Sequence, residues 1–127
     1  MVSQKNGRGF TTTFAYNTPN TGQTTITDPR GNTLVHSYDS TGRIATTTDP
    51  LSGTVNYVYD AKNDRTSITN QNGKTTTFTY DALGNATSIA DPLGNTATFT
   101  YDQNNNLLSA KNPKGNSTTF AYDLKGR

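Results

Sequence analysis

The sequence predicts an all-β fold, built of antiparallel β-hairpin repeats with a 21-residue period that form a meandering, twisted one-layer sheet or a β-solenoid-like shell segment. A first phrase recurs at that period: Tyr38-Asp39, Tyr59-Asp60, Tyr80-Asp81, Tyr101-Asp102 and Tyr122-Asp123. A second phrase, Asp-Pro-x-Gly-Asn or a close variant, lies between these copies at the same period. The segments between the phrases alternate Thr with aromatic or aliphatic residues, as half-buried strands do. Self-similarity at a fixed period indicates a repeat protein.

The composition predicts a thin core. Of the 127 residues 29% are hydrophobic, mean hydropathy is −0.79 and the net charge is +2. There is no cysteine, which excludes disulfides. We expect no membrane span, because no apolar run is long enough, and the first residues lack the apolar core of a signal peptide. We expect no nucleic-acid partner, because the basic residues are scattered rather than clustered.

The period divides the chain into one array over residues 1–127. It contains a partial repeat 1–32, four repeats at 33–53, 54–74, 75–95 and 96–116, and a partial repeat 117–127. Tyr16-Asn17 lies one residue off the period, so the turn over 17–22 carries an inserted residue.

Each repeat should contain two strands and two turns. The first strand is expected at 33–38, 54–59, 75–80, 96–101 and 117–122, and the second at 43–48, 65–69, 85–90 and 106–111. Segments this short, separated by turn residues, favour antiparallel hairpins, because parallel strands need longer connections.

The turn after each first strand is opened by Asp and closed by Gly, which takes a left-handed conformation. Asn63 and Asn105 replace that Gly, and Asn is the other residue that tolerates such dihedrals. The repeat signature therefore comprises Tyr38, Asp39, Gly42, Tyr59, Asp60, Tyr80, Asp81, Gly84, Tyr101, Asp102, Tyr122, Asp123 and Gly126.

The second phrase predicts the other turn. Pro presets φ at the second position and Gly supplies the positive φ that follows. The residues of this turn phrase are Asp28, Pro29, Gly31, Asp49, Pro50, Asp91, Pro92, Gly94, Pro113 and Gly115. Ser52-Gly53 displaces the glycine by one place, which predicts a shifted or bulged turn there.

Alternation also predicts which residues face inward. On the first strands these are the residues two places before each Tyr: Phe14, His36, Tyr57, Phe78, Phe99 and Phe120. On the second strands they are Ile26, Thr47, Ile68, Ile89 and Ala110. Ile44 and Leu107 have the opposite parity, which a bulge or strong twist would reconcile.

The phrase Tyr38-Asp39-Ser40-Thr41-Gly42-Arg43-Ile44, followed by Asp-Pro-x-Gly-Asn, resembles the YD repeat of the Rhs (rearrangement hotspot) family, also found in the C-components of insecticidal toxin complexes and in teneurins. The departures are Asn17, Asn70 and Asn112 for Asp, and Asn63 and Asn105 for Gly.

The resemblance implies an architecture. In that family many repeats form a long sheet that spirals into a hollow shell around a toxic C-terminal polypeptide. We therefore expect a structural segment of the wall of a secreted or cell-surface, polymorphic-toxin-like shell, which encloses or displays a C-terminal effector.

No enzyme is expected, and no catalytic residue, cofactor or metal. His36 occupies an aromatic slot of the repeat, and Cys and Glu are absent. The Asp residues are spaced singly, whereas acid–base catalysis needs them paired. A calcium column is disfavoured, because Asp residues one repeat apart would lie about 9–10 Å from each other.

Two other functions stay open. Free sheet edges would pair with further YD repeats of the same or a neighbouring chain, giving a head-to-tail homo-oligomer or a self-assembling surface filament. Alternatively, the aromatic column would form a carbohydrate-binding platform for a glycan.

Overall fold

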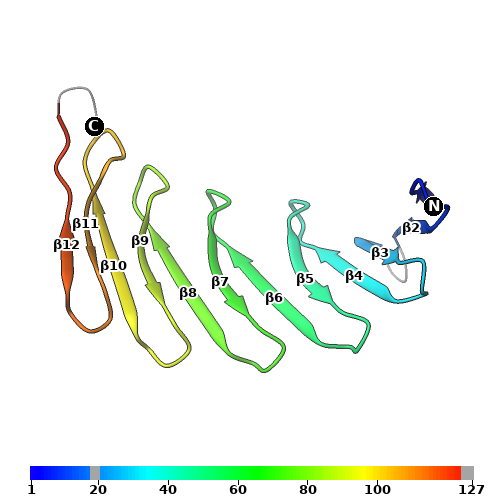
Figure 1. Cartoon of the computed structure of the whole chain (residues 1–127). Helices are drawn as coiled ribbons and strands as arrows, with labels where there is room; N and C mark the ends of the chain where they lie inside the picture. The colour runs from blue at the N-terminus through cyan, green and yellow to red at the C-terminus, as the bar shows by residue number, and fades with distance from the viewer. Residues whose placement is uncertain (18–20, 124–127) are drawn as a thin grey trace. The chain divides into compact units, whose positions relative to one another are not determined.

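The computed structural model describes residues 1–17 and 21–123, and the regular structure in that part is entirely β-strand, without a helix (Figure 1). Twelve strands pair in sequence order in one open antiparallel sheet, which confirms the predicted fold class. The strands are β1 (Val2–Lys5), β2 (Thr11–Tyr16), β3 (Gln23–Thr27), β4 (Thr33–Tyr38), β5 (Ile44–Thr48), β6 (Thr54–Tyr59), β7 (Arg65–Thr69), β8 (Thr75–Tyr80), β9 (Ala86–Ala90), β10 (Thr96–Tyr101), β11 (Leu107–Lys111) and β12 (Ser117–Thr119).

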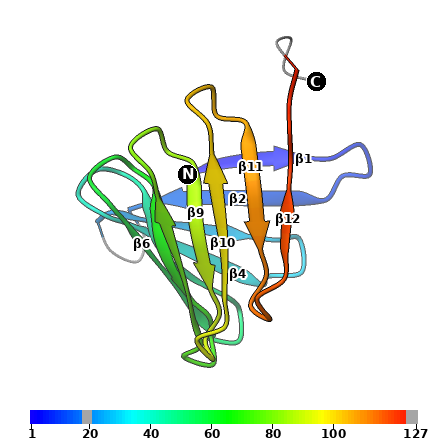
Figure 2. The same ribbon diagram turned by 90° about the vertical axis from the view of Figure 1, so that its left-hand side faces the viewer.

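The chain divides into two compact units, Met1–Tyr57 with Thr69–Asn72, and Val58–Ile68 with Gly73–Arg127. Within the first unit, β1 to β5 form successive antiparallel pairs. Within the second, β8 to β12 do the same, and β9 to β12 lie side by side in both views (Figures 1 and 2). The boundaries of a single array over 1–127 stay a prediction.

The bounds of the strands follow the predicted ones closely. β4, β6, β8 and β10 have the predicted residues, as does β7. The other second strands begin one residue late, because Arg43, Asn85 and Asn106 belong to the turns. The N–H of Asp39, for example, donates to the Arg43 carbonyl at 2.8 Å.

The prediction for 117–122 was too long, since β12 ends at Thr119. Complete first strands such as β10 pair with neighbours on both sides. In β10 the residues Thr96–Thr98 pair with β9, whereas Thr98 to Tyr101 pair with β11. β12 has only β11 as a neighbour among the described strands, and its registered pairing with β11 ends at Thr119.

A bulge resolves the parity of the second strands. The register shifts between Ser37 and Tyr38, so that Ser37 pairs with Thr46 whereas Tyr38 pairs with Ile44. The same shift places Tyr101 opposite Leu107 and Tyr80 opposite Ala86. An extra residue in one strand moves the following side chain to the other face. Ile44 and Leu107 thus lie opposite tyrosines, and the predicted bulge reconciles their parity.

The predicted aromatic slots form registered pairs with the predicted positions of the second strands. Phe14 pairs with Ile26, His36 with Thr47, Phe78 with Ile89 and Phe99 with Ala110. Along β10 the exposure alternates, with Ala97, Phe99 and Tyr101 half-buried and the threonines exposed. No apolar side chain in the described part of the chain is fully buried. The sheet is therefore stabilised by a half-buried stripe on one face rather than by a closed core.

The turn at Ser52-Gly53 is neither shifted nor bulged, so that prediction was wrong. The Ser52 N–H donates to the Asp49 carbonyl at 3.0 Å, and the Asp49 N–H donates to the Gly53 carbonyl at 2.9 Å. Ser52 itself adopts the left-handed conformation, with φ of 67°. Keeping the loop length keeps the register, and the cost is strain at one serine.

Candidate functional site

The two sets of turns carry the polar residues of the repeat signature, and both have the same geometry. In the turn after β3, Asp28 Oδ1 accepts the N–H of Arg30 at 2.8 Å and that of Asn32 at 2.9 Å. The Gly31 N–H donates to the Asp28 carbonyl at 3.0 Å. This is a three-residue hairpin loop, a type I turn followed by a left-handed residue.

The turns after the Tyr-Asp pairs repeat this arrangement at the opposite ends of the strands. Asp81 Oδ1 accepts the N–H of Leu83 at 2.8 Å and that of Asn85 at 3.0 Å. The two phrases were expected to use different chemistry, one based on Pro and one on Asp, but the Asp or Asn side chain caps both. Within the described residues, the same two backbone bonds recur in the turns opened by Asn6, Asp28, Asp39, Asp49, Asp60, Asp81, Asp91, Asp102 and Asn112.

The residue that closes each turn has the positive φ that the sequence predicted. Gly84 has φ of 86°, and Asn63 and Asn105 have φ of 73° and 65°. These two asparagines replace glycine at the one position where a left-handed residue is needed.

The fifth turn residue supplies a contact that the sequence analysis did not assign. Asn95 Nδ2 donates to Asp91 Oδ2 at 2.7 Å, and the Arg43 guanidinium bonds Asp39 Oδ2 at 2.7 Å as part of an ion pair. Equivalent amide donors are Asn32, Asn85 and Asn106. The signal that could have revealed them is the return of Asn or Arg four places after Asp.

These bonds hold the carboxylates in the ionised form. The Asn95 side-chain bond lowers the pKa of Asp91, with further lowering by turn N–H donors. Donation by the backbone N–H of Arg43 holds the pKa of Asp39 well below its usual range. The pKa of Asp28, Asp81 and Asp102 is lowered too, first by the Asn side chain of each turn. A hydrogen bond to the charged form favours that form.

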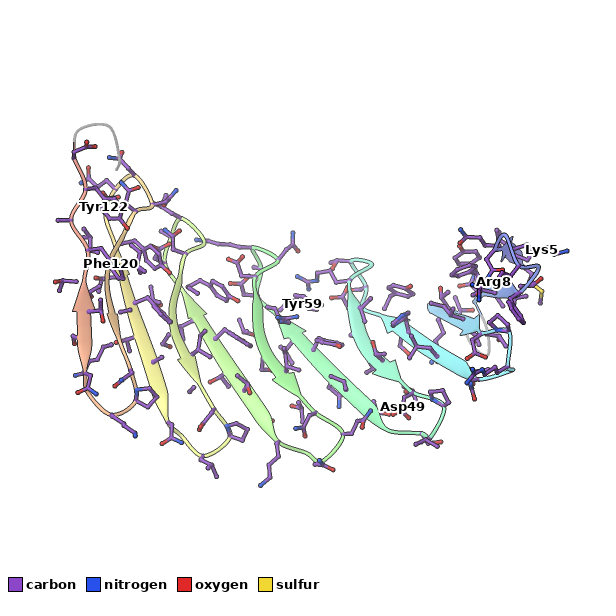
Figure 3. The ribbon with its side chains drawn as sticks, viewed as in Figure 1. Lys5, Arg8, Asp49, Tyr59, Phe120 and Tyr122 are labelled. Carbon is purple, nitrogen blue, oxygen red and sulfur yellow. The ribbon has the colours of Figure 1, made fainter. Side chains whose placement is uncertain are left out.

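In the turn opened by Asp49, the side-chain donor comes from the following turn of the second phrase rather than from within the turn. Gly53 stands where the turn opened by Asp91 has Asn95, and Gln71 Nε2 donates to Asp49 Oδ2 at 2.6 Å instead. The Gln71 side chain fills the vacated space, because a Cβ on Gly53 would lie 2.7 Å from Gln71 Cδ. Figure 3 shows Asp49 at the turn that follows β5.

Contacts between neighbouring repeats also occur at the Tyr-Asp ends. Lys62 Nζ donates to the Ala82 carbonyl at 3.0 Å, and Asn85 Nδ2 to Asn105 Oδ1 at 2.8 Å. Both contacts lie 20 residues apart in sequence, so they join successive turns of the same edge.

The signature tyrosines Tyr80 and Tyr122 bond to the neighbouring strand. The Tyr80 hydroxyl donates to the Arg65 carbonyl at 2.8 Å and the Tyr122 hydroxyl to the Leu107 carbonyl at 2.9 Å. Each contact spans 15 residues and reaches the first residue of the preceding second strand. Gly126 of the signature lies outside the described residues.

The sole histidine, His36, lies in its predicted slot within the stripe. Its Nδ1 is 2.9 Å from Thr47 Oγ1, the side chain of its cross-strand partner. The guanidinium of Arg65 lies 5.6 Å from the centre of the Phe78 ring, so this member of the aromatic column is already occupied by a cation–π contact.

The described residues contain no group of three or more His, Cys, Asp or Glu side chains able to hold a metal ion. Nor does the described part contain a helix long and apolar enough to cross a membrane. Shallow hollows separate successive turns of the second phrase. One, of about 340 Å³, is lined by Asn6, Phe10, Asp28, Pro29 and Arg30.

This chain is similar to a chain in the structure of the Photorhabdus luminescens Tc holotoxin pore, with a TM-score of 0.74 and 17% sequence identity over 98% of this chain. The match spans 8% of the length of that chain, and at this identity it shows the fold. No curated protein gives a significant match.

The family described as RHS Repeat matches residues 21–54, 59–96, 80–117 and 101–127. The last three matches begin 21 residues apart, at the period of the Tyr-Asp pairs. The expected Rhs (YD) repeat array is thus confirmed. The chain belongs to the RHS repeat family.

Proposed function

We propose that this chain is a structural segment of the wall of a toxin-complex-like shell, which encloses or displays a C-terminal effector, and that it performs no chemistry of its own. Its partners would be further YD repeats, joined through the sheet edges, and the effector. The site of action would be outside the cell or on its surface.

The observation that carries this proposal is the match of 98% of this chain to a small part of one much longer chain in a toxin assembly. The turn geometry supports it, because each repeat closes its own turns and offers both strand edges for pairing. Such a unit can be added many times without changing the local structure. Carboxylates that are already bonded within their turns are also poorly placed for acid–base chemistry.

The test is limited proteolysis of the natural polypeptide that contains this sequence. If the repeats enclose an effector, a segment C-terminal to them resists protease until mild denaturant opens the repeats. The same segment expressed alone is digested quickly and serves as the control. Equal rates of digestion in the two settings would contradict enclosure, and detection of the segment only in the cytosol would contradict the proposed location.

A surface fibre is the second candidate, and one observation favours it. Phe120 and Tyr122, beyond the end of β12 (Figure 3), are 41% and 39% exposed, whereas the equivalent Phe99 and Tyr101 are half-buried. An edge with exposed aromatic residues favours pairing with another chain. Filaments of the purified chain seen by electron microscopy would favour the fibre, and a monomer at high concentration would exclude it.

A further inference from the structure

Two asparagines in this chain precede glycine, Asn6-Gly7 and Asn72-Gly73. In such a pair the backbone nitrogen of Gly can attack the side-chain carbonyl carbon of Asn, because Gly has no Cβ to hinder the approach. A C–N bond forms, the amide C–N bond breaks and ammonia leaves, giving a cyclic succinimide. Water then opens the ring to aspartate or isoaspartate.

The Asn6 side chain is held away from this reaction. Asn6 opens its turn, and its Oδ1 accepts the N–H of Arg8 at 3.0 Å and that of Phe10 at 3.1 Å. Both bonds must break before the carbonyl carbon can reach the Gly7 nitrogen. The folded turn therefore protects Asn6.

The Asn72 side chain has no such restraint. Asn72 is the third residue of its turn, exposed, and its backbone N–H donates to Asn70 Oδ1 at 3.0 Å. Its side-chain amide makes no hydrogen bond within the part of the chain that the structure describes. Gly73, which follows it, has φ of 73° and ends the turn. Ring closure at Asn72 thus requires only a local rotation of an exposed turn, one of the least stable parts of a fold.

We propose that Asn72 is a modification site of the folded chain, converted by water to aspartate and isoaspartate with loss of ammonia, whereas Asn6 is protected. The product carries a new carboxylate two residues before Lys74. Isoaspartate also adds one methylene to the main chain between Asn72 and Gly73. The modified turn would be a substrate for enzymes that methylate isoaspartate.

The test compares the two sites within one molecule. The folded chain and a urea-unfolded sample are incubated at mildly alkaline pH, and each Asn-containing peptide is followed by mass spectrometry, with enzymatic methylation as the isoaspartate readout. We expect Asn72 to react roughly ten times faster than Asn6 in the folded chain, and the two to react alike when unfolded. Equal rates in the folded chain, or a folded chain that reacts at neither site, would overturn the proposal.

A variant keeps the test independent of the unfolded sample. Gly73→Asn adds a Cβ at the attacking residue, and the fold accepts Asn there, as Asn63 shows at the equivalent position with the same φ of 73°. The reaction at Asn72 should fall by roughly a factor of ten, because the nitrogen is hindered and Asn restricts the backbone more than Gly. An unchanged rate at Asn72 in this variant would refute the mechanism.

Discussion

Gln71 donates the side-chain hydrogen bond that the turn opened by Asp49 cannot make internally, and the contribution of this bond to stability can be measured. In the natural chain, Gln71→Ala removes the 2.6 Å bond to Asp49 Oδ2. A surface hydrogen bond of this kind is worth about 1 kcal/mol. We therefore expect the free energy of unfolding, measured by urea titration with circular dichroism, to fall by about 1 kcal/mol.

The second step restores the usual turn. In Gly53→Asn, the new Cβ would displace Gln71, since it would lie 2.7 Å from Gln71 Cδ and 2.9 Å from Asp49 Oδ2. The introduced asparagine can then donate to Asp49, as Asn95 donates to Asp91. The effect of Gly53→Asn by itself should be small, because one amide donor replaces another. In this background Gln71→Ala should cost almost nothing, which gives a coupling energy of about 1 kcal/mol in a double-mutant cycle.

Gln103→Ala is the matched control. Gln103 has the same position in its turn and is exposed, but the aspartate 22 residues before it, Asp81, already accepts from Asn85 of its own turn at 3.0 Å. Its removal should change stability by less than about 0.5 kcal/mol. If Gln71→Ala costs the same with and without the Gly53→Asn substitution, or no more than Gln103→Ala, the inferred exchange of donors is wrong.

Three further predictions follow from the turns and the stripe. Acid should destabilise the fold, because a carboxyl whose pKa is lowered by folding stabilises the fold above its unfolded pKa, near 4, and this contribution is lost as pH falls. Asp91→Asn should lose less free energy of unfolding than the unchanged chain between pH 7 and 3 in denaturant titrations, and an equal loss in the two would count against this role of Asp91. Gly84→Ala should lower the free energy of unfolding by about 1–2 kcal/mol, because φ at this position is 86°, whereas Gly84→Asn should lower it clearly less. Equal losses for the two variants in the same assay would argue against a left-handed residue at position 84. Tyr80→Phe should lower the free energy of unfolding by about 1 kcal/mol, because the hydrogen bond from the hydroxyl to the Arg65 carbonyl is lost. Tyr16→Phe, at an exposed tyrosine, is the control, and equal losses for the two variants would refute this role of the Tyr80 hydroxyl.

What the sequence could predict is what the chain determines locally. Asp81 and Gly84 define a turn within five residues, so the turn and the bounds of β8 follow from neighbouring residues alone. The bulge was also accessible, because Ile44 and Leu107 would otherwise face the wrong side of the sheet.

What could not be predicted depends on contacts between repeats or on uncommon backbone conformations. Ser52 adopts a left-handed conformation that serine rarely takes, so the sequence pointed instead to a shifted turn. The donation from Gln71 joins residues 22 apart, and no local pattern indicates it. The end of β12 at Thr119 follows its pairing with β11 and is not indicated by its own Thr and Phe residues.

The central claim is that a single turn chemistry acts at both ends of the strands. It is tested most directly by amide hydrogen exchange, measured by NMR residue by residue. The N–H of Asp39, Asp60 and Asp102 at one end, and of Asp28 and Asp91 at the other, should exchange slowly and to similar degrees, because each donates to the fifth residue of its turn at 2.8–2.9 Å. Fast exchange at all the turns of one end, with protection only at the other, would contradict the account.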